Sequence, residues 1–305
     1  MSAEPVLQTH ALGKRFGRFE AVRDLSLTVN RGDVYGFLGL NGAGKTTTIR
    51  MLLGLIRPTA GSAALFGLDP VRRRLEVLRR VGALVEVPAF YPYLSGRQNL
   101  EIIARLLGGD ARGRIPTALE QVGLGDRGAT KVRAYSQGMR QRLGIAQALL
   151  GDPELVILDE PVNGLDPQGI LEIRELIQRR QRERGTTFFL SSHLLYEVEL
   201  SCNRIGIICD GTLVEEGSVA ELLGRTEGAV RLRAAPEARA REFLGAVGWV
   251  RLVDGAPPGT LHVQAPPGRL AELNRKMVEA GLDVAELAPQ RMTLEEYFLG
   301  RGVAK

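Results

Sequence analysis

The sequence predicts an α/β fold in which a mixed sheet is interrupted by a helical segment, with a smaller α+β domain at the end of the chain. Three observations predict it. Two short apolar runs, at residues 34–38 and 155–158, are typical of fully buried strands. From about residue 88 to residue 151, apolar residues recur at helical spacing. After about residue 224, prolines and glycines separate short strands and short helices, which indicates a second domain.

The first part of the chain predicts strands followed by a helix. Residues 6–9 and 25–29 read as strands, and the buried run at residues 34–38 follows a turn. A glycine-rich segment comes next, after which residues 46–53 predict a helix. Residues 57–62 are expected to be a loop, because proline, glycine and serine accumulate there.

The remaining elements follow from the same patterns. Helices are expected within residues 100–107 and 139–150. Asp210-Gly211 is a two-residue hairpin signal between two apolar runs. Strands are expected at residues 155–158, 187–190, 205–209, 212–215, 229–233 and 261–264.

The composition is that of a globular chain. Its 305 residues suggest two domains at roughly 150 residues each. Hydrophobic residues make up 44% of the chain, enough to exclude a wholly disordered protein. No stretch approaches the ~18–20 uninterrupted apolar residues of a membrane span, so a membrane role would require a partner.

No secretory signal is expected, and Cys202 and Cys209 are expected to be buried inert thiols. The expected compartment is the cytoplasm.

The net charge is +5, and arginines spread along the chain account for most of the basic residues. The densest basic run lies at residues 71–80, on a helix-like pattern. One interpretation is a solvated helix face, and the other is contact with phosphates of RNA, DNA or lipid headgroups. No RNA- or DNA-reading motif accompanies the run.

Residues 39–46 match the pattern GxxxxGK[ST] at every fixed position, between a buried strand and a helix. The glycines let backbone N–H groups point at phosphate oxygens, and the helix adds its positive N-terminal end. Lys45 is expected to reach the β- and γ-phosphates, and the Thr46 hydroxyl to ligate Mg²⁺. The alternative is a glycine-rich turn that binds no ligand, but such a turn would not require a buried strand before it and a helix after it. The loop residues expected to bind the nucleotide are Gly39, Asn41, Gly42, Ala43, Gly44, Lys45, Thr46 and Thr47, although Thr47 could simply start the helix.

Two acids follow the second buried strand directly. Asp159 and Glu160 stand at its carboxyl end, where open α/β sheets place their ligands. Asp159 is expected to be the carboxylate on the metal side, and Glu160 is placed to polarise an attacking water. Without the loop at residues 39–46, the pair could be a polar end to the strand.

A third element begins at Ser136, which is expected to cap the helix that continues to Leu150. Alone, it would be only a cap. The phosphate loop, this serine-glycine helix start and the apolar Asp-Glu strand together resemble the ATP-binding subunit of ABC transporters. The family's signature usually reads LSGGQ. This chain keeps Ser136 and Gly138, and departs from the signature at Tyr135, Gln137 and Met139.

The resemblance covers about residues 4–220 and implies further site residues. Residues 161–167 look like the family's D-loop, which places Asp166 among the nucleotide-binding residues. His193 looks like the switch histidine that contacts the γ-phosphate, and with Lys45 and Glu160 it completes the expected catalytic set. Phe16 matches the aromatic residue that stacks on adenine. Taken alone, His193 would be a hydrogen-bonding group at a strand end, and Phe16 a core residue.

Glu86 stands where most members carry the glutamine of the Q-loop. A glutamate followed by Pro-Ala-Phe-Tyr at residues 88–91 resembles the branch of bacitracin and lantibiotic resistance exporters. Residues 291–299 resemble the chain end of drug and antibiotic exporters. Glu86 is expected to contact Mg²⁺ or the attacking water, and the alternative is an exposed loop acid.

The resemblance implies an ATP-hydrolysing subunit that powers a separate membrane permease, exporting an antibiotic, a peptide or another hydrophobic compound. The alternative is a soluble ABC-type ATPase acting on nucleic acid or ribosomes. A single phosphate loop, and only 90 residues between Lys45 and Ser136, favour the exporter. An unrelated P-loop kinase would lack the helix at Ser136 and the histidine at 193.

The implied organisation is an ABC ATP-binding domain at residues 1–224, with a helical subdomain at about residues 88–151, and an accessory domain at residues 225–305. ATP and Mg²⁺ are the expected cofactors. Two copies are expected to face each other head to tail, each ATP lying between one copy's loop and the other copy's Ser136 and Gly138. The expected place is the cytoplasmic face of the cell membrane, bound through the permease, with no nucleic-acid partner.

Overall fold

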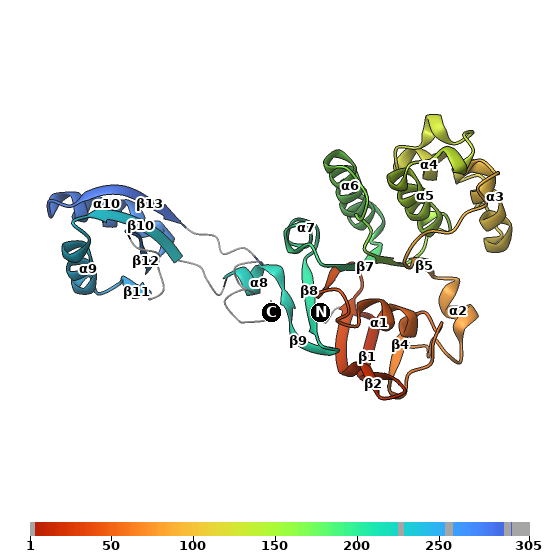
Figure 1. Ribbon diagram of the computed structural model, residues 1–305, viewed down its shortest axis with the longest axis horizontal. Coiled ribbons are helices and arrows are strands. Elements are labelled where there is room, and N and C mark those ends of the chain that lie inside the picture. Colours follow the sequence, from red (N-terminus) through yellow and green to blue (C-terminus); the bar gives the residue numbers. More distant parts are fainter. Residues whose placement is uncertain (1–3, 225–228, 254–258, 290–293, 295–305) are drawn as a thin grey trace. The chain divides into compact units, whose positions relative to one another are not determined.

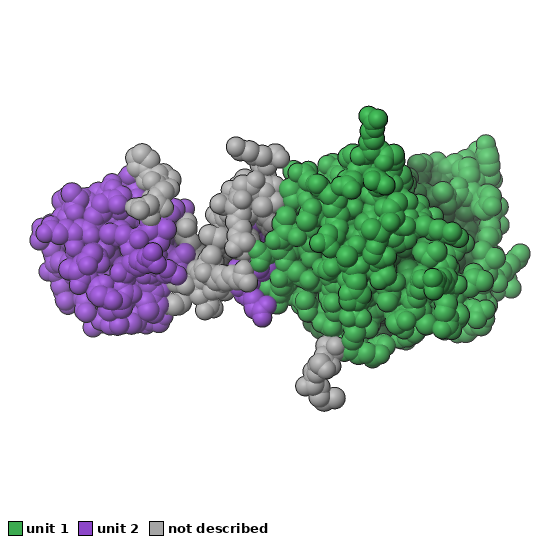
Figure 2. All heavy atoms as spheres, turned by 90° about the horizontal axis from the view of Figure 1, so that it is seen from below, with its two compact units in different colours: residues 1–218 green, residues 219–305 purple. Residues whose placement is uncertain are grey.

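The computed structural model describes residues 4–224, 229–253, 259–289 and 294. The chain divides into two compact units, Met1–Ser218 and Val219–Lys305, which Figure 2 colours separately. The sequence-based boundary at residue 224 falls just after the short helix α8 (Val219–Gly224), the first element of the second unit. Of the chain-end segment 291–299, only Leu294 lies among the described residues.

The first unit contains two sheets. A six-stranded sheet has the order β5-β6-β7-β3-β8-β9, in which only the β8–β9 pairing is antiparallel. An antiparallel sheet has the order β2-β1-β4. These strands are β1 (Pro5–Phe16), β2 (Phe19–Asn30), β3 (Val34–Leu38), β4 (Ala60–Leu65), β5 (Val81–Leu84), β6 (Leu155–Asp159), β7 (Thr187–Ser192), β8 (Arg204–Cys209) and β9 (Thr212–Ser218).

One prediction in this region is wrong. Residues 57–62 were expected to form a loop, but β4 begins at Ala60. Ala60 and Ser62 lie opposite Gly13 and His10 of β1, so pairing with a long neighbouring strand overrides the weak strand propensity of small residues.

Helix α1 (Lys45–Leu52) joins the two sheets, packing on β2, β4 and β6 (Figure 1). Its apolar face is fully buried through Ile49, Met51 and Leu52, which belong to the main hydrophobic core. On the same core, the rings of Tyr35 and Phe189 stack with centroids 5.6 Å apart. The start of α1 is thereby held beyond the carboxyl end of β3, an inner strand of the six-stranded sheet.

The helical segment lies at the β5 end of the unit and comprises α3 (Gly96–Leu107), α4 (Ile115–Gln121) and α5 (Gln137–Leu149) (Figure 1). Ser95 caps α3 in a capping box with Gln98. The other helices of the unit are α2 (Arg74–Leu78), α6 (Pro167–Arg184) and α7 (Leu195–Ser201). Among the described residues, none of the helices has the length and apolar character needed to span a bilayer.

The second unit has its own core and its own sheet of order β11-β12-β10-β13, a split βαβ arrangement. Its core includes Val230, Leu244, Leu273 and Met277, none of which belongs to the core of the first unit. The elements are β10 (Ala229–Ala235), α9 (Glu237–Ala246), β11 (Arg251–Val253), β12 (Leu261–Gln264), α10 (Leu270–Glu279) and β13 (Asp283–Pro289).

Candidate active site

The sheet order brings three functional segments together at the carboxyl ends of neighbouring strands. β3, β7 and β6 are parallel neighbours, so their carboxyl ends meet at the same side of the sheet. The loop 39–46 follows β3, Asp159 ends β6, and His193 follows β7. In register, Leu38 lies opposite Ser192, and Asp159 lies opposite Ser191.

The loop 39–46 needs its glycines for two different reasons. Gly42 and Gly44 have φ values of 85° and 105°, which side-chain-bearing residues rarely adopt. At Gly39, a Cβ would lie 2.5 Å from the carbonyl oxygen of Ile208, so the backbone approach itself excludes a side chain. The helix that follows has no side-chain cap and no acid in its first turn. Its N-terminal N–H groups are suited to bind an anion.

Lys45 lies inside this loop and is almost completely buried, with 6% of its surface exposed. Its ammonium donates to the carbonyl oxygens of Gly39 (2.6 Å) and Leu40 (3.2 Å). The same Nζ lies 3.3 Å from Oε1 of Glu160, a buried atom with no hydrogen-bond partner of its own. Carbonyl oxygens compensate a buried ammonium only partly, so the position favours a further anionic partner such as a phosphate.

Thr46 and Asp159 form the second contact of the cluster. The Thr46 hydroxyl donates to Oδ2 of Asp159 at 2.8 Å, and the Ser191 hydroxyl donates to Oδ1. Asp159 is 3% exposed, so its carboxylate is held in place. A hydroxyl and a carboxylate are hard oxygen ligands of the kind that Mg²⁺ prefers.

Glu160 is the residue at which the cluster converges. Its Oε2 lies 2.9 Å from Nδ1 of His193, while its Oε1 faces Lys45. Its backbone adopts φ 49°, and its N–H lies within reach of both the carbonyl (3.2 Å) and the hydroxyl (2.9 Å) of Ser191. A strained, doubly held backbone aims the carboxylate between a lysine and a histidine. Such a carboxylate can accept a proton from water.

Ser136, Gly138 and Asp166 lie at the starts of two helices, α5 and α6. The Ser136 hydroxyl caps α5 by accepting from the Met139 N–H at 3.1 Å, which confirms the predicted cap. Asp166 caps α6 by accepting from the Gly169 N–H at 3.0 Å. No hydrogen bond or ion pair within the described part of the chain joins Ser136 or Gly138 to the loop 39–46.

Gly138 packs closely on the segment before α6. A Cβ at this position would lie 3.1 Å from the carbonyl oxygen of Gly164. A side chain here would push this carbonyl away by a few tenths of an ångström, so the close packing favours glycine, as in the signature.

Two of the predicted residues have no hydrogen bond or ion pair, within the described part of the chain, to the Lys45 cluster, which consists of Lys45, Thr46, Asp159, Glu160 and His193. Phe16, at the end of β1, is 48% exposed and has the Lys14 ammonium 5.0 Å from its ring centroid, so the core alternative for Phe16 is wrong. Glu86, just after β5, is half exposed and forms an ion pair with Arg50 of α1. Its φ of 57° is also left-handed.

The remaining loop residues differ in exposure. Asn41 is exposed, Thr47 is half-buried, and Ala43 is buried, with its carbonyl accepting from the Gly211 N–H at 3.1 Å. These positions leave Asn41 accessible to a ligand at the rim of the loop. Of the cysteines, Cys202 is buried and burial raises its pKa strongly, whereas Cys209 is partly exposed.

Sequence reasoning missed two residues of the site. Ser191 holds both Asp159 and the backbone of Glu160, and Gln141 donates to the carbonyl oxygens of Glu160 (3.2 Å) and Pro161 (3.1 Å). Ser191 precedes His193 by two residues in the recognised strand, and Gln141 lies within the recognised helix. Both residues thus lie inside predicted elements, but their partners lie at the end of β6 or directly after it, far away in the sequence.

Comparison with known proteins agrees with this geometry. The protein-family model described as ABC transporter matches residues 22–163. A bacitracin transport ATP-binding protein of Bacillus licheniformis is 42% identical over 96% of both chains. A daunorubicin resistance ATP-binding protein of Streptomyces coeruleorubidus is 38% identical over 97% of this chain and 96% of the other. A solved ATP-binding subunit of an ABC transporter superposes with a TM-score of 0.66 at 29% identity, covering 72% of this chain and 92% of that one.

Proposed function

Since the chain belongs to the family of ABC transporter ATP-binding proteins, we propose that its Lys45 cluster hydrolyses ATP to drive export of an antibiotic-like compound through a separate membrane permease. ATP hydrolysis coupled to transport is the activity of the family. The proposal depends on one observation. Five side chains lie together at the carboxyl ends of parallel strands of one sheet: Lys45, Thr46, Asp159, Glu160 and His193.

The residues fit a bound ATP and a metal ion. The loop 39–46 would hold the phosphates through its backbone N–H groups and through the ammonium of Lys45. In the structure this ammonium donates hydrogen bonds to backbone carbonyl oxygens instead. Thr46 and Asp159 would hold Mg²⁺, and the 2.8 Å contact between their oxygens supports this because it places two oxygen ligands side by side. When bound, the metal supplies positive charge to the phosphate oxygens.

The chain's own residues divide the remaining work. Glu160 orients an attacking water and accepts its proton at Oε2 or Oε1. His193, hydrogen-bonded to that carboxylate, keeps it in place and can in turn contact the terminal phosphate. Lys45 balances the charge that develops on the phosphate oxygens. Phe16 offers an exposed ring on which adenine can stack.

A second copy of the chain is needed for the site in this proposal. Ser136 is exposed, and the described contacts of Ser136 and Gly138 are with α5 and the segment before α6 rather than with the loop 39–46. A head-to-tail dimer would place them against the loop of the other copy. Asp166, at the start of α6, then lies at the same interface.

The permease and the cargo are proposed from the relatives. No described helix can cross a bilayer, so the pathway would be a second polypeptide, and the chain would sit at the cytoplasmic face of the membrane through it. The relatives in bacitracin transport and daunorubicin resistance support an antibiotic or a similar hydrophobic compound as cargo. Nothing in the site favours nucleic acid or ribosomes.

The proposed cargo can be tested in a sensitive host. The chain would be co-expressed with a candidate permease sought among the neighbouring genes, and growth would be measured against bacitracin and daunorubicin. We expect tolerance to rise for at least one compound with the wild-type chain and not with a Glu160→Gln chain expressed at the same level. Equal tolerance for both chains would contradict ATP-driven export of these compounds.

A further inference from the structure

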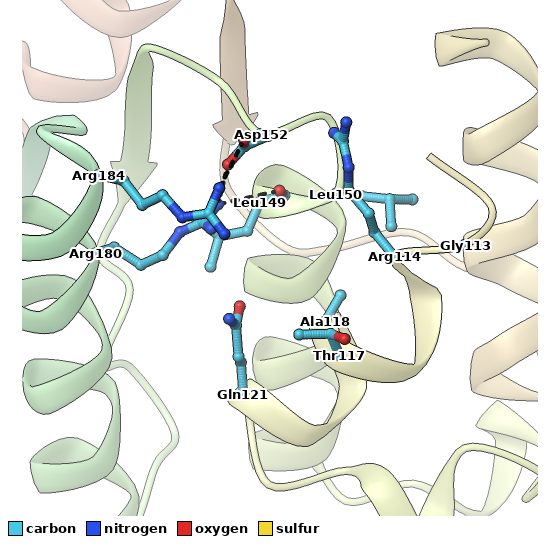
Figure 3. A pocket seen from close by; sticks show the side chains of 10 residues that line it. All are labelled: Gly113, Arg114, Thr117, Ala118, Gln121, Leu149, Leu150, Asp152, Arg180 and Arg184. Carbon is cyan, nitrogen blue, oxygen red and sulfur yellow. Dashed lines mark hydrogen bonds and ion pairs between the residues drawn. The ribbon is translucent and has the colours of Figure 1, made fainter. Parts of the chain in front are cut away.

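A cavity of about 210 Å³ lies between α4, the carboxyl end of α5 and the carboxyl end of α6 (Figure 3). Its polar lining consists of Arg114, Thr117, Gln121, Asp152, Arg180 and Arg184. Asp152 precedes β6, whereas Asp159 ends it, so the cavity faces the opposite end of that strand from the Lys45 cluster. It is therefore separate from the candidate active site.

The charges around the cavity do not balance. Asp152 is its one lining carboxylate, and its two oxygens lie 3.2 Å from Arg180 and 3.3 Å from Arg184. Arg114 approaches from the other side, as Figure 3 shows, and its guanidinium makes no hydrogen bond or ion pair with the described residues. One carboxylate and three guanidinium groups thus line the cavity, and this excess of positive charge favours an additional anion.

Arg180 is the buried member of the group. Its side chain is 8% exposed, and its Nε is buried without a hydrogen-bond partner. One terminal nitrogen reaches the carbonyl oxygen of Leu149 only at 3.5 Å. Burial lowers the pKa of Arg180, and the positive charges of Arg184 and Arg114 act in the same direction against the pull of Asp152. An anion in the cavity would relieve this unfavourable burial of charge.

We propose that this cavity binds a small phosphate-bearing anion, either inorganic phosphate or a small phosphate monoester. Guanidinium groups present paired N–H donors that match phosphate oxygens, and three of them line this cavity. The Thr117 hydroxyl and the Gln121 amide, below the arginines in Figure 3, can donate to the remaining oxygens. A volume of about 210 Å³ is below the roughly 300–1,000 Å³ of drug-sized sites, so the ligand is small.

The cavity also joins two parts of the first unit. Arg114 directly precedes α4 in the helical segment, and Arg184 ends α6 beside the six-stranded sheet. A phosphate bound by both would hold α4 against α6. Helices α5 and α6, which start at the Ser136 and Asp166 caps, both end at this cavity.

The test is calorimetric titration of the full chain with inorganic phosphate at constant ionic strength. A Lys45→Ala background removes most binding at the loop 39–46, so the result does not depend on the proposed ATPase function. In that background we expect saturable binding that weakens about tenfold for each of Arg114→Gln and Arg184→Gln. Arg182→Gln, an exposed arginine of α6 that does not line the cavity, is the matched control and should leave the affinity unchanged.

The two sources are separated by titrating glycerol phosphate beside inorganic phosphate. Tighter binding of the ester supports a monoester ligand, and tighter binding of inorganic phosphate supports the free ion. The proposal is overturned if phosphate does not bind saturably, if the Arg114 and Arg184 variants bind it as the control does, or if succinate binds as tightly. Because both substitutions keep a polar side chain and affect incompletely buried residues, thermal melting should show folded variants.

Discussion

Replacing Glu160 by glutamine removes one charge and leaves the size of the side chain almost unchanged. Glutamine has the same reach, so the contact of the Oε2 position with His193 at 2.9 Å can be kept. It can neither accept a proton from water nor neutralise Lys45. We therefore expect ATP binding to survive and hydrolysis to fall by roughly 10²–10⁴-fold, the usual cost of losing a general base.

The charge geometry gives the direction of the effect on binding. At 3.3 Å, the Coulomb attraction between Glu160 and Lys45 is about 5 kcal/mol with an effective dielectric constant of about 20, before desolvation is subtracted. Glutamine removes most of this attraction. Lys45 is then freer to engage a phosphate, so ATP affinity should stay equal or increase.

The assay is phosphate release under saturating ATP, with affinity measured by calorimetry and oligomeric state by size-exclusion chromatography. We expect the Glu160→Gln chain to accumulate as a dimer with ATP. Glu175→Gln, an exposed glutamate of α6, is the charge-matched control and should turn over normally. Normal turnover together with a monomeric elution profile for Glu160→Gln would refute Glu160 as the base.

The same geometry predicts the outcome of four other changes. Lys45→Ala should weaken ATP binding at least about tenfold, because it removes the charge-assisted bonds to the phosphates. An unchanged affinity by calorimetry would contradict phosphate binding by the loop 39–46. Ser136→Arg should abolish turnover while an isolated subunit still binds ATP, and loss of that binding would indicate a local folding defect. Glu86→Gln should preserve ATP binding but change the dependence of turnover on Mg²⁺ concentration, because the neutral amide cannot form the ion pair with Arg50. If turnover depends on Mg²⁺ concentration as in the wild type, Glu86 is only an exposed acid with no role in turnover. Deleting residues 225–305 should leave a folded, nucleotide-binding first unit, since the two cores share no residue; an insoluble product would contradict this.

The residues that the sequence could predict are those fixed by a local motif. The loop 39–46 needs its glycines for backbone reasons, Asp159 and Glu160 follow from their place after a buried strand, and the Ser136 cap follows from the helix behind it. Each of these depends on neighbours in the chain.

The residues that the sequence could not predict depend on contacts between distant elements. Ser191 reaches Asp159 only because β6 and β7 are paired in one particular register. Arg180 and Arg184 lie one turn apart on α6, but Arg114 precedes α4, and it joins them only through the way α4 packs near α6. Strand β4 was missed for the same reason, because its small residues become a strand through pairing with β1.

The central claim is that one ATP site is built from the loop of one copy and Ser136 of another. Mixing Lys45→Ala and Ser136→Arg chains tests it most directly, because each is inactive alone but the mixed dimer has one intact composite site. If pairing is random and sites are independent, an equal mixture should recover about a quarter of wild-type phosphate release, since half of the dimers carry one intact site of two. If the mixture stays as inactive as either variant alone, the two-copy site is contradicted.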